Sequence, residues 1–148
     1  MQKEDEPKKL EALGLFLTKS PSEPKRFSQP CAALYGCRCR IYPDRPTYCR
    51  KFTCLLLKRL KAREISLTEA KNIVKAAREK SAAVLVLLRQ LGDRSEHCAL
   101  TDRVRRTAGR LGKAHPDEPT AAIYARLTLA FHELTVMLGD SFYQPPTD

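Results

Sequence analysis

Cysteines gather in one short segment of this 148-residue chain. Five of the six fall within 24 residues, while Cys98 stands apart. The five are Cys31, Cys37, Cys39, Cys49 and Cys54. A tetrahedral zinc site needs four soft ligands, and iron–sulfur clusters also favour four thiolates. The spacing therefore predicts a bound zinc ion or an iron/iron–sulfur centre, with five candidate ligands for four positions.

The cellular compartment decides how these cysteines are interpreted. The N-terminus is charged and shows no signal peptide, and the longest apolar stretch, 82–88, is too short to span a bilayer. We therefore expect a cytoplasmic protein without a membrane partner. Thiols stay reduced there, and clustered thiols more often hold a metal than form disulfides. Buried reduced thiols without an ion, and a redox disulfide pair, are the two alternative interpretations.

A rigid turn and a run of basic residues accompany the cysteines. The turn is Tyr-Pro-Asp-Arg-Pro at 42–46, where two prolines restrict the backbone and would let a short loop enclose an ion. Four thiolates around a divalent ion keep a net negative charge, which nearby cations can offset. We expect Arg45 and Arg50 to lie behind the ligands and to offset this charge through contacts with thiolate sulfurs or by proximity. The Arg45 guanidinium is expected to donate to thiolate sulfurs or loop carbonyls. Arg38, Arg40 and Lys51 add to the positive charge.

The segment 39–54 reads CRIYPDRPTYCRKFTC. It closely resembles the C-x-I-Y-x-x-R-P-x-x-C-R-x-F-x-C signature of YkgJ-type cysteine-cluster proteins, a proposed zinc- or iron-chelating family often called CxxCxxCC. The resemblance covers about 24 residues and implies that Cys39, Cys49 and Cys54 are metal ligands. It matches Cys31 to the cysteine that usually precedes them, and this leaves Cys37 as the spare thiol or substitute.

The chain departs from this family at its upstream half. Family members usually begin with a C-x-x-C-x-x-C-C run, and this chain has no cysteine before Cys31. The departure indicates either a reduced, single-site member or a true start codon further upstream. The resemblance implies metal binding in an accessory or metal-handling role. The related flagellin lysine N-methylases suggest a first alternative, an iron-dependent protein-modifying activity.

A second alternative is a nucleic-acid-binding module with a structural zinc site. The formal net charge is +10, and the basic excess is centred on residues 27–64. Two groups of basic side chains could contact phosphates: Arg103, Arg105, Arg106 and Arg110, and Lys58, Arg59, Lys61 and Arg63. We favour solvated helix surfaces for both groups, because the motif's Tyr42, Tyr48 and Phe52 are expected to pack rather than stack on bases. No catalytic constellation stands out, so a non-enzymatic role is favoured.

The elements that must position the cysteines are predicted to be mainly α-helical. Residues 1–26 are expected to form a flexible arm, residues 27–140 a single domain, and residues 141–148 a tail. Within the domain, 27–54 forms an irregular cysteine-rich metal-binding loop that packs on a small helical bundle, 53–140. A capping box at 66–69 and apolar residues at helical spacing predict a long helix over 67–91. Further helices are predicted over 53–60, 102–111 and 117–139.

Overall fold

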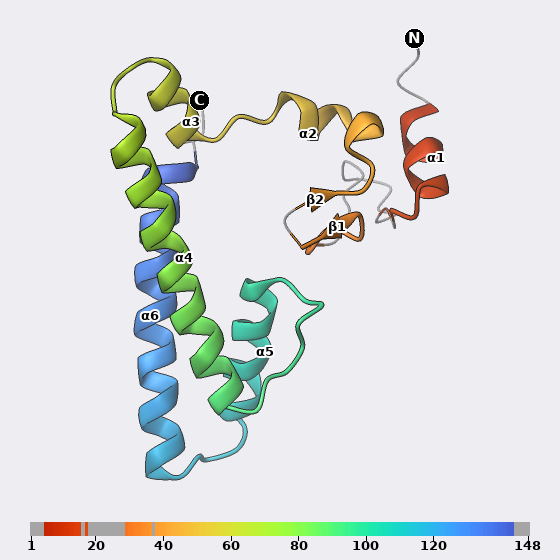
Figure 1. The fold of residues 1–148 in the computed structure, drawn as a ribbon. Helices are drawn as coiled ribbons and strands as arrows, with labels where there is room; N and C mark the ends of the chain where they lie inside the picture. Colours follow the sequence, from red (N-terminus) through yellow and green to blue (C-terminus); the bar gives the residue numbers. More distant parts are fainter. Residues whose placement is uncertain (1–4, 16, 18–28, 37, 144–148) are drawn as a thin grey trace, which may run out of the picture. The chain divides into compact units, whose positions relative to one another are not determined.

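The computed structural model describes residues 5–15, 17, 29–36 and 38–143. The chain is mainly helical, as the sequence predicts (Figure 1). It divides into two compact units, Met1–Phe52 with Glu96–Ala99, and Thr53–Ser95 with Leu100–Asp148. The boundary falls inside the predicted cysteine loop, so that Cys49 lies in the first unit and Cys54 in the second. The single domain over 27–140 stays a prediction.

The first unit is built from short elements. These are helix α1 (Asp5–Ala12), strands β1 (Leu34–Tyr35) and β2 (Arg38–Cys39), the 3-10 helix η1 (Tyr42–Asp44) and helix α2 (Thr47–Lys51). The strands pair antiparallel, with Leu34 opposite Cys39 and Tyr35 opposite Arg38. The sequence predicts an irregular loop over 27–54, because elements of two to five residues are too short to show a periodic pattern.

Helix α1 is the part of the expected N-terminal arm that the structure describes in detail, and it packs on the cysteine loop. Its last turn closes in a Schellman motif, in which Gly14 takes a φ of 84° and the Leu15 amide donates to the Leu10 carbonyl at 3.0 Å. The motif brings Leu10 and Leu15 together, and both are buried with Ala33. Burying a leucine side chain stabilises a fold by about 1.5–3 kcal/mol. Residues 5–15 are therefore docked rather than free.

The second unit contains four helices: α3 (Leu55–Lys61), α4 (Leu67–Gln90), α5 (Leu100–Leu111) and α6 (Glu118–Phe142). The predicted capping box begins α4, with the Glu69 amide donating to Ser66 Oγ at 3.1 Å and the Ser66 amide to Glu69 Oε2 at 2.7 Å. Helices α4 and α6 lie side by side and run antiparallel (Figure 1). Helix α6 continues past its predicted end, because Gly139 is not among the positive-φ glycines and the helical backbone extends through Phe142.

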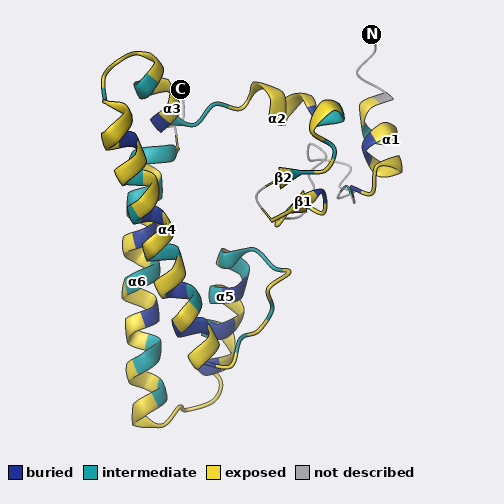
Figure 2. Ribbon diagram, viewed as in Figure 1, coloured by how far each residue is buried: buried dark blue, intermediate teal, exposed yellow. Residues whose placement is uncertain are grey.

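The core of the second unit lies where α4, α5 and α6 meet, and it appears dark blue in Figure 2. Its most buried residues are leucines and a valine from all three helices. They are Val84, Leu87, Leu88, Leu91, Leu111, Leu127 and Leu134. The residues at 84, 87, 88 and 91 recur at intervals of three and four, and Leu127 and Leu134 lie seven apart. Both spacings place the residues on one face of their helix, which is why the sequence pattern predicted the two long helices.

A second Schellman motif ends α4 and leads into a buried ion pair. Gly92 takes a φ of 82°, and the Asp93 amide donates to the Leu88 carbonyl at 2.9 Å. Arg103 Nε donates to Asp93 Oδ2 at 2.7 Å, and the Ser95 amide to Oδ1 at 3.0 Å. Burial alone would raise the pKa of Asp93, but the hydrogen bonds from Arg103 and Ser95 outweigh it and hold the pKa at about 2.

By length and composition, α6 is long and apolar enough to cross a membrane. The core helix of a soluble protein can meet the same criterion, so it is weak evidence for a membrane span. Little of its apolar window is buried within the described residues. The helix therefore carries more apolar surface than the core of the second unit covers.

The Asp93–Arg103 pair predicts a specific acid sensitivity. Because the folded-state pKa of Asp93 lies below its usual 3.8, its stabilising effect is complete above about pH 4 and is lost as the pH falls toward 2. Asp93→Asn should lower the free energy of unfolding by roughly 2 kcal/mol near neutral pH, and this difference should shrink at pH 2. Denaturant unfolding of both proteins across this pH range measures the effect.

The exposed pair Asp102–Arg105 provides the control. Asp102→Asn should change the free energy of unfolding by less than about 1 kcal/mol, since exposed ion pairs contribute little. A difference between Asp93→Asn and wild type that is equally large at pH 2 and pH 6 would contradict the assigned role of the ionised Asp93.

Candidate functional site

The first unit contains a pocket of about 400 Å³ that is lined by Cys31, Cys39 and Cys49. These are three of the four cysteines that the family resemblance implies as ligands. The remaining wall is mostly apolar, with one guanidinium from Arg45. It is formed by Leu15, Gln29, Leu34, Ile41, Tyr42, Arg45, Pro46, Tyr48 and Phe52.

Backbone contacts of the hairpin position two of these cysteines. Cys39 lies on β2, and Cys31 precedes β1 in a turn in which the Leu34 amide donates to the Cys31 carbonyl at 2.9 Å. The Arg40 amide donates to the Ala33 carbonyl at 2.9 Å and extends the hairpin by one more contact. Cys31 and Cys39 also pack against the buried Leu10, Leu15 and Ala33. The hairpin thus brings both thiols to the same side of the small core.

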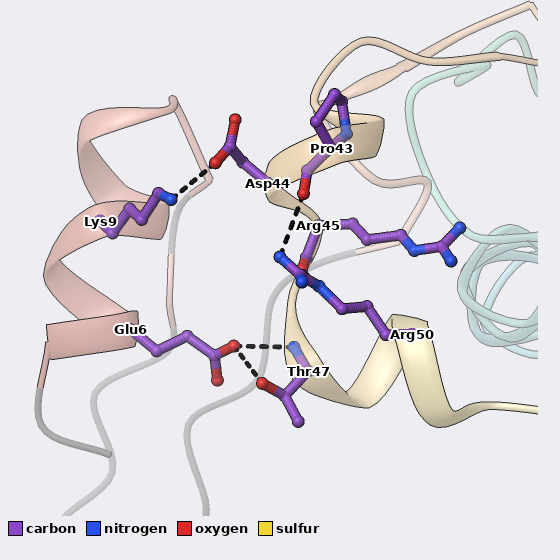
Figure 3. A network of polar contacts seen from close by, with 7 residues as sticks. All are labelled: Glu6, Lys9, Pro43, Asp44, Arg45, Thr47 and Arg50. Atoms are coloured by element: carbon purple, nitrogen blue, oxygen red, sulfur yellow. Dashed lines mark hydrogen bonds and ion pairs between the residues drawn. The ribbon is translucent and has the colours of Figure 1, made fainter. Parts of the chain in front are cut away.

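The third cysteine, Cys49, lies on α2, whose first turn is capped by α1. The amide and the hydroxyl of Thr47 both donate to Glu6 Oε1, at 2.7 and 2.6 Å (Figure 3). The Thr47 hydroxyl and then the Thr47 amide lower the pKa of Glu6. Lys9 Nζ adds an ion pair with Asp44 Oδ1 at 2.6 Å. Helix α1 therefore holds both η1 and α2 at the edge of the pocket.

The two arginines predicted behind the ligands have different partners. Arg50 donates from Nε to the Arg45 carbonyl at 2.9 Å and from Nη2 to the Pro43 carbonyl at 3.1 Å (Figure 3). The guanidinium of Arg45 lies over the Tyr42 ring, 4.0 Å from its centroid, in a cation–π contact. Arg50 thus makes the loop-carbonyl contacts that the sequence predicts for Arg45, whereas the Arg45 side chain lines the pocket wall.

The three thiols share one electrostatic environment. Desolvation raises the pKa of the Cys49 thiol, and the nearby Cys31 and Cys39 raise it further, while Arg45 lowers it. Cys31 and Cys39 are half-buried, Cys49 is exposed, and all three are free thiols. The donor chemistry therefore fits a soft metal such as zinc or iron.

The convergence of the donors is incomplete. Within the described part of the chain, no group of three or more His, Cys, Asp or Glu side chains could hold a metal ion as the side chains stand. Cys54 is the half-buried N-cap residue of α3 and belongs to the second unit. Cys37, the predicted spare, lies outside the described residues. The structure thus brings three of the predicted ligands, Cys31, Cys39 and Cys49, to one pocket within the first unit.

Two features of the first unit were not predicted from the sequence. The docking of α1 has a sequence signal in hindsight, because Leu10, Gly14 and Leu15 have the spacing of a Schellman motif with its apolar contact. The aromatic residues Tyr42, Tyr48 and Phe52 were expected to pack, but Tyr48 is 74% exposed. Tyr35, which was not among the residues expected to pack, is 77% exposed. Tyr42 and Phe52 are exposed as well, although both contribute to the pocket wall.

Four basic residues of the second unit make contacts within their own unit. Arg103 is buried against Asp93, the Arg110 guanidinium donates to the Leu91 carbonyl, and Arg105 pairs with Asp102. Arg59 pairs with Glu64. The expectation of a solvated surface is therefore wrong for Arg103, whose guanidinium belongs to the buried corner between α4 and α5. These contacts favour structural roles for the arginines over a phosphate-binding face.

Comparisons of this chain with protein-family models, with curated proteins and with solved structures find no match. The resemblance of 39–54 to the YkgJ-type signature accordingly stays a prediction from the motif. The function is therefore argued from the pocket and its residues alone.

The paired carbonyl contacts of Arg50 generate a prediction about the turn. Arg50→Lys keeps the charge but removes the planar fork that reaches both carbonyls. Each contact is exposed, so together they contribute roughly 1 kcal/mol. Amide hydrogen exchange in 42–51 should then become about fivefold faster. The exposed Arg38→Lys is the matched control and should leave this exchange rate unchanged; equal rates in all three proteins would show that Arg50 does not hold the turn.

Proposed function

We propose that the cysteine loop binds a metal ion, either zinc or an iron/iron–sulfur centre, in a non-enzymatic accessory or metal-handling role. The observation that carries the proposal is the pocket shared by Cys31, Cys39 and Cys49. These thiols come from the turn before β1, from β2 and from α2, which are separate in sequence. Buried-thiol packing does not account for this placement, because Cys49 is exposed.

The surroundings of the pocket support a negatively charged metal–thiolate centre. Arg45 lines the pocket, and the exposed Arg38, Arg40 and Lys51 lie in the same unit. A fourth thiol would come from Cys54 or Cys37, and the chain between Cys49 and Cys54 is short enough to deliver the former. A bound metal would supply a cross-link between the hairpin and α2, and the apolar core beneath the hairpin is small.

Metal analysis of the anaerobically purified full chain tests the proposal. Elemental analysis identifies zinc or iron, and an absorption spectrum separates an iron–sulfur cluster from colourless zinc. We expect stoichiometric metal in the wild type and its loss in Cys39→Ser and Cys49→Ser, since each variant removes one thiolate ligand. Cys98→Ser is the matched control and should retain the metal, because Cys98 does not line the pocket.

Two outcomes would contradict metal binding at this pocket. One is a wild-type protein that takes up neither zinc nor iron with sulfide under reducing conditions. The other is metal retention in Cys39→Ser and Cys49→Ser equal to that of Cys98→Ser. Parallel replacements of Cys31, Cys37 and Cys54 by Ser then identify the remaining ligands.

The exposed aromatic residues support a second candidate function, the binding of single-stranded nucleic acid. Tyr35 and Tyr48 present most of their surface to solvent, and the basic Arg38, Arg40 and Lys51 are also exposed. Aromatic platforms combined with cations that track a phosphate backbone are typical of such binding. In this candidate function the metal centre would be structural.

The second candidate predicts salt-dependent binding of a single-stranded oligonucleotide. Tyr48→Ala should weaken binding about tenfold, since stacking of one base on an aromatic ring contributes roughly 1–3 kcal/mol. Fluorescence anisotropy at several salt concentrations measures the affinity. Tyr143→Ala, which removes an exposed tyrosine of the second unit, is the control. Absence of binding at low salt, or equal effects of both variants, would exclude this candidate.

A further inference from the structure

Helix α6 has two apolar faces, and the core of its unit covers one of them. Leu127 and Leu134 lie on the inner face and are buried against α4 and α5. On the outer face, Leu129 is 60% exposed and Val136 is 47% exposed. Because α6 is apolar on its outer face as well as on the inner face that packs in the core, its composition resembles that of a membrane-spanning helix.

The outer face has the spacing of a coiled-coil seam. We call its residues the outer seam: Ala122, Ala125, Leu129, His132, Val136 and Gly139, all exposed. They recur at alternating intervals of three and four, which is the heptad pattern of two helices that pack along their length. Small residues at both ends of the seam would let two helix backbones approach closely, while Leu129 and Val136 supply the larger apolar contacts near its centre.

We propose that the outer seam pairs antiparallel with the same seam of a second copy of this chain. The seam is self-complementary in one register, which places Leu129 opposite the partner's His132, and Ala125 opposite the partner's Val136. The heptad positions beside the seam are Arg126, Glu133 and Asp140, all exposed. In this register Arg126 lies between the partner's Glu133 and the partner's Asp140, and two-fold symmetry repeats the contact. The charges therefore complement one another in the antiparallel arrangement.

Thr128 and Thr135 lie on the other flank of the seam, and their hydroxyl groups do not need water as a hydrogen-bond acceptor. Thr128 Oγ1 donates to the Tyr124 carbonyl at 3.0 Å, and Thr135 Oγ1 to the Phe131 carbonyl at 2.8 Å. Both hydroxyl donors are thus satisfied within α6. On the charged flank, Glu133 already pairs with Lys80 at 2.6 Å, which fixes the carboxylate that the partner's Arg126 would meet. Each flank therefore needs little rearrangement before pairing.

A shallow groove lies where the register requires one. His132, Glu133 and Val136 line this groove, which has a volume of about 500 Å³. The partner's Leu129 would enter between these three residues, as a knob enters a hole in coiled-coil packing. A lipid surface fits the same face less well, because His132, Glu133 and Asp140 would have to enter the bilayer with it.

Sedimentation of the full chain over a wide range of concentrations, with reductant to prevent disulfide dimers, tests the proposal. The wild type should form a dimer that dissociates on dilution. Leu129→Glu should be monomeric where the wild type is dimeric, and Arg126→Glu should raise the dissociation constant about tenfold by placing like charges together. The matched control is Val86→Glu, which alters an equally exposed apolar residue of α4 outside the seam and should leave the dimer intact.

Circular dichroism confirms that each variant remains helical, which is expected because both apolar sites are at least half exposed. A wild type that stays monomeric throughout would overturn the proposal, as would equal behaviour of Leu129→Glu and Val86→Glu. Binding of monomeric wild type to phospholipid vesicles, abolished by Leu129→Glu, would also overturn it and assign the face to a membrane surface. Metal content is measured on the same samples, so that a change in oligomeric state can be distinguished from a change at the cysteine loop.

Discussion

The contact between Glu6 and Thr47 ties the first helix of the chain to the helix that carries Cys49. Helix α2 has only five residues and no capping side chain of its own, so its first amide depends on a carboxylate from elsewhere. Glu6 provides that carboxylate, and Leu10 on the next turn of α1 enters the small core beneath Cys31 and Cys39. The arrangement of three thiols around one pocket therefore depends on a helix that precedes all of them in the sequence.

This dependence also clarifies what a metal would contribute. The first unit has a small apolar core, a two-residue hairpin and polar contacts at its surface, and each surface contact is weak in water. Under the proposed function, thiol–metal bonds would join segments that such contacts hold only loosely, and the binding free energy would then become folding free energy. Proline residues on both sides of Asp44 restrict the turn in advance and would reduce the entropy lost when a ligand is bound.

The second unit is stabilised mainly by its apolar core. Its stability comes from leucine packing between two long antiparallel helices, with α5 fixed at one end by the buried Asp93–Arg103 pair. That pair places a charged group in a largely apolar corner, and it is tolerated because hydrogen bonds satisfy both oxygens of the carboxylate. The core of the unit buries the inner face of α6 and leaves the outer face exposed. Its available surface is therefore apolar and helical, whereas that of the first unit is aromatic and basic.

Much of this structure follows from local sequence signals. The capping box at Ser66 and Glu69, the acidic N-cap at Asp117 and the three–four spacing of leucines determine where the long helices form, because these interactions operate within one or two turns. The cysteine motif likewise indicates metal chemistry from residue type and spacing alone. Short elements such as β1, β2 and α2 are not recognisable in this way, since their few residues carry no period and their backbone partners are distant.

Only tertiary structure decided how distant residues meet. It placed Arg103 in a buried corner, although its sequence neighbours Arg105 and Arg106 are exposed. It also docked α1 on the cysteine loop, and it gave the loop-carbonyl contacts to Arg50 rather than to Arg45. The sequence by itself determined the helices, because helical propensity and spacing are local properties, and it predicts a metal as the ligand of the thiols from their donor chemistry. Which thiols share a pocket, and which face of α6 stays exposed, depended on long-range packing, because burial is a property of the whole fold.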